Sequence, residues 1–154
     1  MNWLKILSVE EKKVVKNLLK KQFGIETVPG LMVKKGQERI FLFIGKLHPR
    51  DIKNVESGII IERVGIYFAK IENNEIRLSI EGTQLLKNQI SKNIFELNDE
   101  QLKQWMTGNQ LDIATGKKGF LIMKYKDDFL GCGKASAEKI SNFVPKTRRL
   151  RQKG

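Results

Sequence analysis

Sulfur and imidazole ligands are almost absent from this chain of 154 residues, which has one cysteine, Cys132, and one histidine, His48. One cysteine cannot form a disulfide within the chain, and a zinc site needs several such ligands close together. We therefore expect no metal site and no internal disulfide. The low cysteine content also predicts a reducing, cytoplasmic environment.

No catalytic constellation is visible either. His48 stands before Pro49 in a turn, where a surface imidazole is more common than a catalytic base, and no second residue supports it. The run Gly131–Lys134 is not a phosphate-binding loop, because that motif needs glycine where Asp128 stands and Ser or Thr where Ala135 stands. We predict that the chain is not an enzyme and has no cofactor; an enzyme of an unrecognised type is the alternative.

Long apolar runs and secretory features are missing as well. No stretch approaches the ~18 uninterrupted apolar residues at which a membrane span would be suspected. The start Met1-Asn2-Trp3 has no charged region leading into an apolar one. Apolar residues still make up 40% of the chain, enough for a real core. We expect a soluble protein of one domain or two small ones.

The charge is strongly basic. The chain has 29 Lys and Arg against 17 Asp and Glu, for a formal net charge of +12. Residues 129–154 hold seven of the basic residues against Glu138 alone, which is half of that net charge. A charge of this size favours a polyanionic partner, either a nucleic acid or an anionic membrane surface. The same segment contains apolar anchors, so we expect it to be folded and not a disordered tail. These anchors are Ile140, Phe143, Val144 and Leu150.

Local signals in the first part of the chain predict a helix followed by strands. Ser8 and Glu11 form a capping-box pattern before an apolar spacing of helical period, and Gly24 offers a left-handed stop, so we expect a helix over 9–23. The pattern then predicts a strand at 39–44, a hairpin of 64–71 and 75–80 around Asn73-Asn74, and a helix over 83–90. A polar break near Lys92 ends the first predicted domain, residues 1–91.

The second predicted domain, residues 92–154, has short strands around one helix, which favours a small barrel. The expected elements are a strand at 94–97, a helix from Asn98 or Asp99 to Met106, and strands at 110–113, 119–125 and 129–135.

Two features of this half have a packing interpretation and a ligand-binding alternative. Gly131 and Gly133 would leave one face of a strand without side chains. We favour close packing of the protein on that face over contact with a nucleic-acid backbone. Trp105 shares a helix face with Leu102 and Met106, so we favour core packing over base stacking.

The second half resembles a PUA domain, a small RNA-binding pseudobarrel. The segments that carry the resemblance are Gln101–Ile113, Gly119–Tyr125 and Phe129–Lys134. The ending Ile140–Leu150 is similar to the terminus of PUA-like modules associated with the Nop/Sun (Fmu) RNA cytosine methyltransferases. Those enzymes need a cofactor-binding α/β domain and catalytic cysteines, so the resemblance implies RNA binding and not methyl transfer.

The first half, in particular the segments 64–70 and 76–80, resembles the domain that precedes PUA in the Nip-seven ribosome assembly factors. The two resemblances together imply an α+β fold, with an N-terminal mixed α/β (pre-PUA-like) domain followed by a small PUA-like β-pseudobarrel.

These resemblances imply a non-catalytic protein that binds RNA, with ribosomal RNA as the first candidate and tRNA as the second, in ribosome biogenesis or RNA modification. Basic side chains near the carboxyl end would neutralise phosphates, and a second group beside the predicted helix would line the region that reads nucleotides. The first group is Lys134, Lys139, Lys146, Arg148, Arg149 and Arg151, and the second is Gln104, Thr107 and Gly108. Because Arg148 and Arg149 are adjacent, we expect them to point to different faces, with a carboxylate as the alternative partner of one of them.

Two other functions remain as alternatives. The chain could be a protein-interaction module that docks an RNA methyltransferase or a ribosomal protein, and such binding would survive nuclease treatment. A membrane-surface protein is disfavoured, because neither a lipidation signal nor an amphipathic helix accompanies the basic end.

Overall fold

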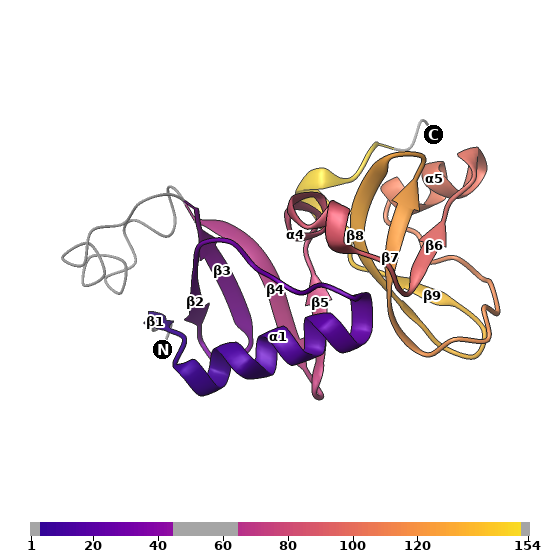
Figure 1. Ribbon diagram of the computed structural model, residues 1–154. Helices are drawn as coiled ribbons and strands as arrows, with labels where there is room; N and C mark the ends of the chain where they lie inside the picture. The colour runs from indigo at the N-terminus through magenta and orange to yellow at the C-terminus, as the bar shows by residue number, and fades with distance from the viewer. Residues whose placement is uncertain (1–3, 45–64, 152–154) are drawn as a thin grey trace.

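The computed structural model describes residues 4–44 and 65–151, which form two sheets (Figure 1). The first sheet has the strand order β1-β2-β3-β4-β5, and all its neighbouring strands are antiparallel. The second has the order β6-β7-β8-β9, with β6 parallel to β7 and the other pairs antiparallel. The prediction for His48 and the first residue of the predicted hairpin, Val64, lie outside the described residues.

The elements of the first half are β1 (Leu4–Ile6), α1 (Val9–Phe23), β2 (Leu31–Lys35), β3 (Arg39–Phe43), β4 (Ile66–Glu72) and β5 (Glu75–Leu78). Between the sheets come α4 (Ile80–Leu85) and the 3-10 helix η1 (Lys87–Gln89). The second half consists of β6 (Ile94–Glu96), α5 (Asp99–Met106), β7 (Gly119–Tyr125), β8 (Asp128–Ala135), β9 (Ile140–Asn142) and the 3-10 helix η2 (Lys146–Arg148). The predicted α+β class is confirmed.

Helix α1 begins and ends at the residues that the sequence predicts. The Ser8 hydroxyl accepts a hydrogen bond from the Glu11 amide at 3.2 Å, and the Glu11 carboxylate accepts one from the Ser8 amide at 3.0 Å. Gly24 ends the helix at φ 78°, a left-handed conformation that costs glycine little. The helix buries Val15, Leu19 and Phe23 and lies along the first sheet (Figure 1).

The hairpin turn and three strands of the second half also match the predictions. Asn73 and Asn74 turn between β4 and β5 at φ 51° and 60°. Strands β6, β7 and β8 and helix α5 lie where the patterns predicted them, within one residue at each end.

Two other predictions fail, and three strands were missed. The helix predicted over 83–90 begins earlier, because Ser79 caps α4 by accepting a hydrogen bond from the Gly82 amide, and η1 replaces its second half. The strand predicted at 110–113 forms a single bridge, between Leu111 and Ile140. Strands β1, β2 and β9 were not predicted from the sequence.

The largest core cluster contains residues from both halves of the chain. Side chains of α1 and of the first sheet pack in it together with four residues of the second sheet, namely Phe120, Ile122, Phe129 and Cys132. A second cluster lies within the second half around Trp105, which is fully buried, so its predicted core packing is confirmed. We call the first cluster the shared core.

Candidate nucleic-acid interface

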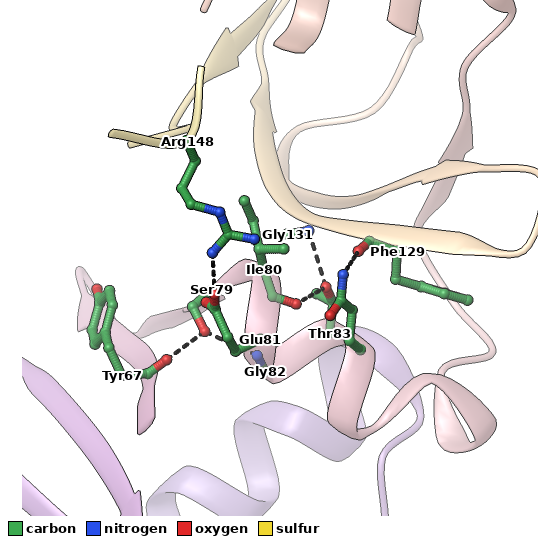
Figure 2. A network of polar contacts seen from close by, with 10 residues as sticks. Tyr67, Ser79, Ile80, Glu81, Gly82, Thr83, Phe129, Gly131 and Arg148 are labelled. Carbon is green, nitrogen blue, oxygen red and sulfur yellow. Dashed lines mark hydrogen bonds and ion pairs between the residues drawn. The ribbon is translucent and has the colours of Figure 1, made fainter. Parts of the chain in front are cut away.

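Helix α4 is bonded to strand β8 by a network of polar contacts that we call the seam (Figure 2). Thr83, which is fully buried, accepts a hydrogen bond from the Gly131 amide at 2.9 Å and donates one to the Ile80 carbonyl at 2.8 Å. Gln84 donates to the Phe129 carbonyl at 3.4 Å. The seam therefore fixes the position of the second sheet against the end of the first.

Two glycines of β8 allow close packing on this strand, Gly131 against α4 and Gly133 against β9 and α5. A Cβ at Gly131, where φ is 79°, would lie 3.2 Å from the Ile80 nitrogen. A Cβ at Gly133 would lie 2.5 Å from Ile140 and 2.7 Å from the Trp105 ring. Both contacts are with other parts of the fold, so the packing interpretation of these glycines is confirmed.

Cys132, between the two glycines, is buried and chemically inert. Its sulfur accepts a hydrogen bond from the Leu78 amide at 3.3 Å. Burial raises the pKa of the thiol to about 12 against the smaller opposing effects of that hydrogen bond and of Arg77. A thiol that stays protonated at neutral pH is not a nucleophile. Among the described residues, no group of three or more His, Cys, Asp or Glu could hold a metal ion.

The basic end of the chain folds back onto the protein. Arg148 forms an ion pair with Glu81 of α4 (Figure 2). Arg149 donates to the Val144 carbonyl at 2.9 Å, and the Leu150 amide donates to the Met106 carbonyl at 2.7 Å. Of the two adjacent arginines, Arg148 is therefore the one paired with a carboxylate. This ion pair leaves less of the charge of Arg148 available for a ligand.

The predicted nucleotide-reading residues lie at the end of α5, next to this basic segment. A Cβ at Gly108 would lie 2.5 Å from Nε of Arg149, so the arginine side chain crosses directly over the glycine. The Thr107 hydroxyl is engaged with the carbonyls of Lys103 and Gln104, each at 2.9 Å, while the Gln104 side chain is exposed. The structure therefore places Gly108 against Arg149, whereas Gln104 lines another pocket, with Asn98 and Asp112.

The remaining predicted phosphate contacts do not all share one place. Lys146 and Arg151 are exposed in the terminal segment, and no described residue forms a hydrogen bond or an ion pair with either side chain. Lys139 is in the turn between β8 and β9, which lies away from η2 (Figure 1). Lys134 lies with its ammonium group 5.3 Å from the centroid of the Phe120 ring. As a set, these site residues stay a prediction.

A cleft between the two halves, which sequence reasoning missed, has a volume of about 350 Å³. We call it the junction cleft. Its lining residues come from β3, β4, β5, the start of α4, β8 and the segment after β9: Arg39, Tyr67, Arg77, Leu78, Ser79, Ile80, Glu81, Leu130, Gly131, Cys132, Phe143, Val144 and Pro145. The outward positions of Arg39 and Arg77 could have been read from the strand alternation. Their meeting with Phe143 depends on tertiary packing.

Aromatic and cationic groups pack together in the cleft lining and directly behind it. The Arg77 guanidinium lies 4.1 Å from the centroid of the Phe143 ring, and Phe143 lies 6.0 Å from Phe120, the ring beside Lys134. Burial raises the pKa of the Tyr67 hydroxyl, while the charges of Arg77 and Arg39 act in the opposite direction. Both guanidinium groups are therefore close enough to affect the phenol.

Residues 92–150 match the family model described as the methyltransferase RsmF PUA domain. The chain is also similar to ribosomal RNA small subunit methyltransferase F of Shewanella oneidensis, with 27% identity over 141 residues, which are 90% of this chain and 28% of that protein. The protein of the same name from Psychromonas ingrahamii is 28% identical over 131 residues, 81% of this chain and 26% of that protein. This chain thus spans little more than a quarter of the length of these relatives.

The carboxyl-terminal part of this chain is therefore a PUA domain, of the kind associated with the Nop/Sun RNA methyltransferases, as the ending Ile140–Leu150 predicted. The resemblance of the first half to the Nip-seven factors stays a prediction. In the part of the chain that the structure describes, no helix is long and apolar enough to cross a membrane.

Proposed function

We propose that this chain is a non-catalytic RNA-binding module that acts on ribosomal RNA in ribosome biogenesis or RNA modification, in the cytoplasm. The observation that carries the proposal is the PUA domain at residues 92–150, whose last residues form an exposed basic segment folded against α4 and α5. The names of the relatives support ribosomal RNA as the ligand, ahead of tRNA. Any methyl transfer would be carried out by a partner enzyme.

The proposal includes a division of the chain into an N-terminal α+β domain, residues 1–91, and the PUA domain, residues 92–154. Two observations support it: each sheet is built from strands on one side of Lys92, and the family match begins there. The shared core and the seam join the two domains, so we expect them to unfold together.

Docking of an RNA methyltransferase is the second candidate function. It is supported by the relatives, which are methyltransferases with most of their length outside the match. The two functions predict different behaviour, because a protein complex survives nuclease treatment and a complex held by RNA does not.

The test is binding of a small-subunit ribosomal RNA fragment, measured by fluorescence anisotropy over a range of salt concentrations. Replacing Lys146 and Arg151 with alanine removes two exposed charges whose side chains no described residue binds. We expect the slope of log affinity against log salt to fall by roughly 1.4 to 1.8, because each of the two lost phosphate contacts removes about 0.7 to 0.9.

The matched control replaces Lys13 and Lys16 with alanine. Both are exposed on α1, which lies away from the terminal segment (Figure 1). This control removes the same charge and should leave the slope nearly unchanged. An equal loss in both variants would mean that only the net charge matters, and the absence of RNA binding by the unmodified chain would reject the proposal.

A further inference from the structure

The junction cleft is a positively charged site whose two arginines lack acidic partners. Among the described residues, no carboxylate lies within ion-pair distance of Arg39 or Arg77. The one carboxylate in the lining, Glu81, is already paired with Arg148. Two guanidinium groups that face a cleft without a neutralising acid favour an anionic occupant.

The size and shape of the cleft limit that occupant. Its volume of about 350 Å³ lies near the lower end of the ~300–1,000 Å³ range of small-molecule sites. A duplex is therefore far too large to enter it, whereas a single unit of an anionic polymer fits the scale.

The aromatic side chains indicate which polymer unit this is. Tyr67 and Phe143 line the cleft, and the Arg77 guanidinium lies over the Phe143 ring, 4.1 Å from its centroid. Unpaired bases stack on aromatic rings and on arginine planes, while their phosphates bind arginine. An acidic peptide would use the arginines but would gain little from the rings.

One residue already predicted to contact phosphate, Lys134, packs behind the lining of the cleft. Phe143 packs against Phe120, and Lys134 lies beside the Phe120 ring. Phe120 is buried, so these contacts connect Lys134 with the cleft lining through the core and not along an open surface.

We propose that the junction cleft binds one unpaired nucleotide of the RNA, with its phosphate on Arg39 and Arg77 and its base against Tyr67 and Phe143. This inference rests on the proposed function. It adds a ligand class, single-stranded RNA, and it assigns part of the binding to the domain that precedes PUA.

The test compares an unstructured ten-nucleotide RNA with a perfect duplex of the same sequence, by fluorescence anisotropy. The variant Arg39→Gln/Arg77→Gln removes both charges from the cleft, and Lys5→Gln/Lys13→Gln removes two charges elsewhere as the matched control. Circular dichroism verifies that each variant is folded. Tyr67→Leu keeps the residue apolar and removes the aromatic ring.

We expect the unmodified chain to prefer the single strand. The cleft variant should lose at least tenfold in affinity for the single strand and much less for the duplex. Tyr67→Leu should lose about 5- to 100-fold for the single strand, the range measured when one stacking platform is removed.

The inference fails if the cleft variant binds the single strand as tightly as the Lys5/Lys13 control does. If the Lys146/Arg151 variant still weakens binding in that case, the proposed function survives and only the cleft assignment is wrong. If a ten-residue oligoglutamate binds the unmodified chain but not the cleft variant, and the RNA does not bind, the occupant is a protein and both proposals are overturned.

Discussion

Thr83→Val is the sharpest test of the seam. The substitution keeps the shape of a fully buried side chain but removes the hydroxyl that accepts from the Gly131 amide and donates to the Ile80 carbonyl. The buried amide of Gly131 then has no acceptor in the network, and leaving one buried polar group unsatisfied costs about 1–3 kcal/mol. For a chain of this length, each kcal/mol lowers the melting temperature by roughly 2–4 °C.

The comparison variant is Thr83→Ser, which keeps the hydroxyl and loses only a methyl group, at about 0.8 kcal/mol. Thermal unfolding followed by circular dichroism and by tryptophan fluorescence measures both variants. We expect Thr83→Val to melt below Thr83→Ser, and both probes to report one transition because the core is shared. Equal melting temperatures for the two variants would refute the assignment of stability to this hydroxyl.

The remaining predictions concern packing, charge and pH. Gly133→Ala places a Cβ 2.5 Å from Ile140 and should destabilise the fold by about 1–3 kcal/mol in urea unfolding, more than Gly116→Ala, whose Cβ meets nothing within 4 Å and suffers only backbone strain. Glu81→Gln removes the one acidic group among the described residues that line the junction cleft and should raise RNA affinity about 2- to 5-fold at low salt, with the gain shrinking as salt is added; unchanged affinity would count against the cleft assignment. The bond from Lys34 holds the pKa of Glu11 at about 2, below its ordinary 4.5, so its stabilising contribution is complete above pH ~4.5 and is lost as the pH falls towards 2. Glu11→Gln, which can still complete the capping box, should flatten this part of the curve of stability against pH, and an unaltered curve would contradict the pairing.

Predictions that rest on local signals were confirmed most closely. Helix α1 has a cap at Ser8 and a left-handed glycine at Gly24, and both signals act within one turn of the helix. Helix α4 lacks the second half of a capping box, because its third residue is Gly82. The helix was therefore predicted to start at residue 83, although it starts at Ile80. Strand β2, Leu31–Lys35, has no apolar alternation that distinguishes it from a loop.

The candidate site also has one part that local sequence signals predicted and another part that they did not. The basic segment near the carboxyl end is visible in the sequence because its residues are neighbours in the chain. The partner of Arg148 lies 67 residues away, and the junction cleft brings together side chains as distant as Arg39 and Phe143. Such pairings depend on how the two sheets pack, and a single sequence taken by itself carries no direct signal for them.

The shared core has a practical consequence for anyone who would borrow the PUA domain as a portable RNA-binding tag. Residues 92–150 taken alone would carry Phe120, Ile122 and Phe129 on an uncovered face, because α1 and the first sheet supply the other side of that cluster. Such a fragment would be prone to aggregate through this exposed apolar surface. A fusion protein that uses this PUA domain should therefore also include the N-terminal domain, residues 1–91.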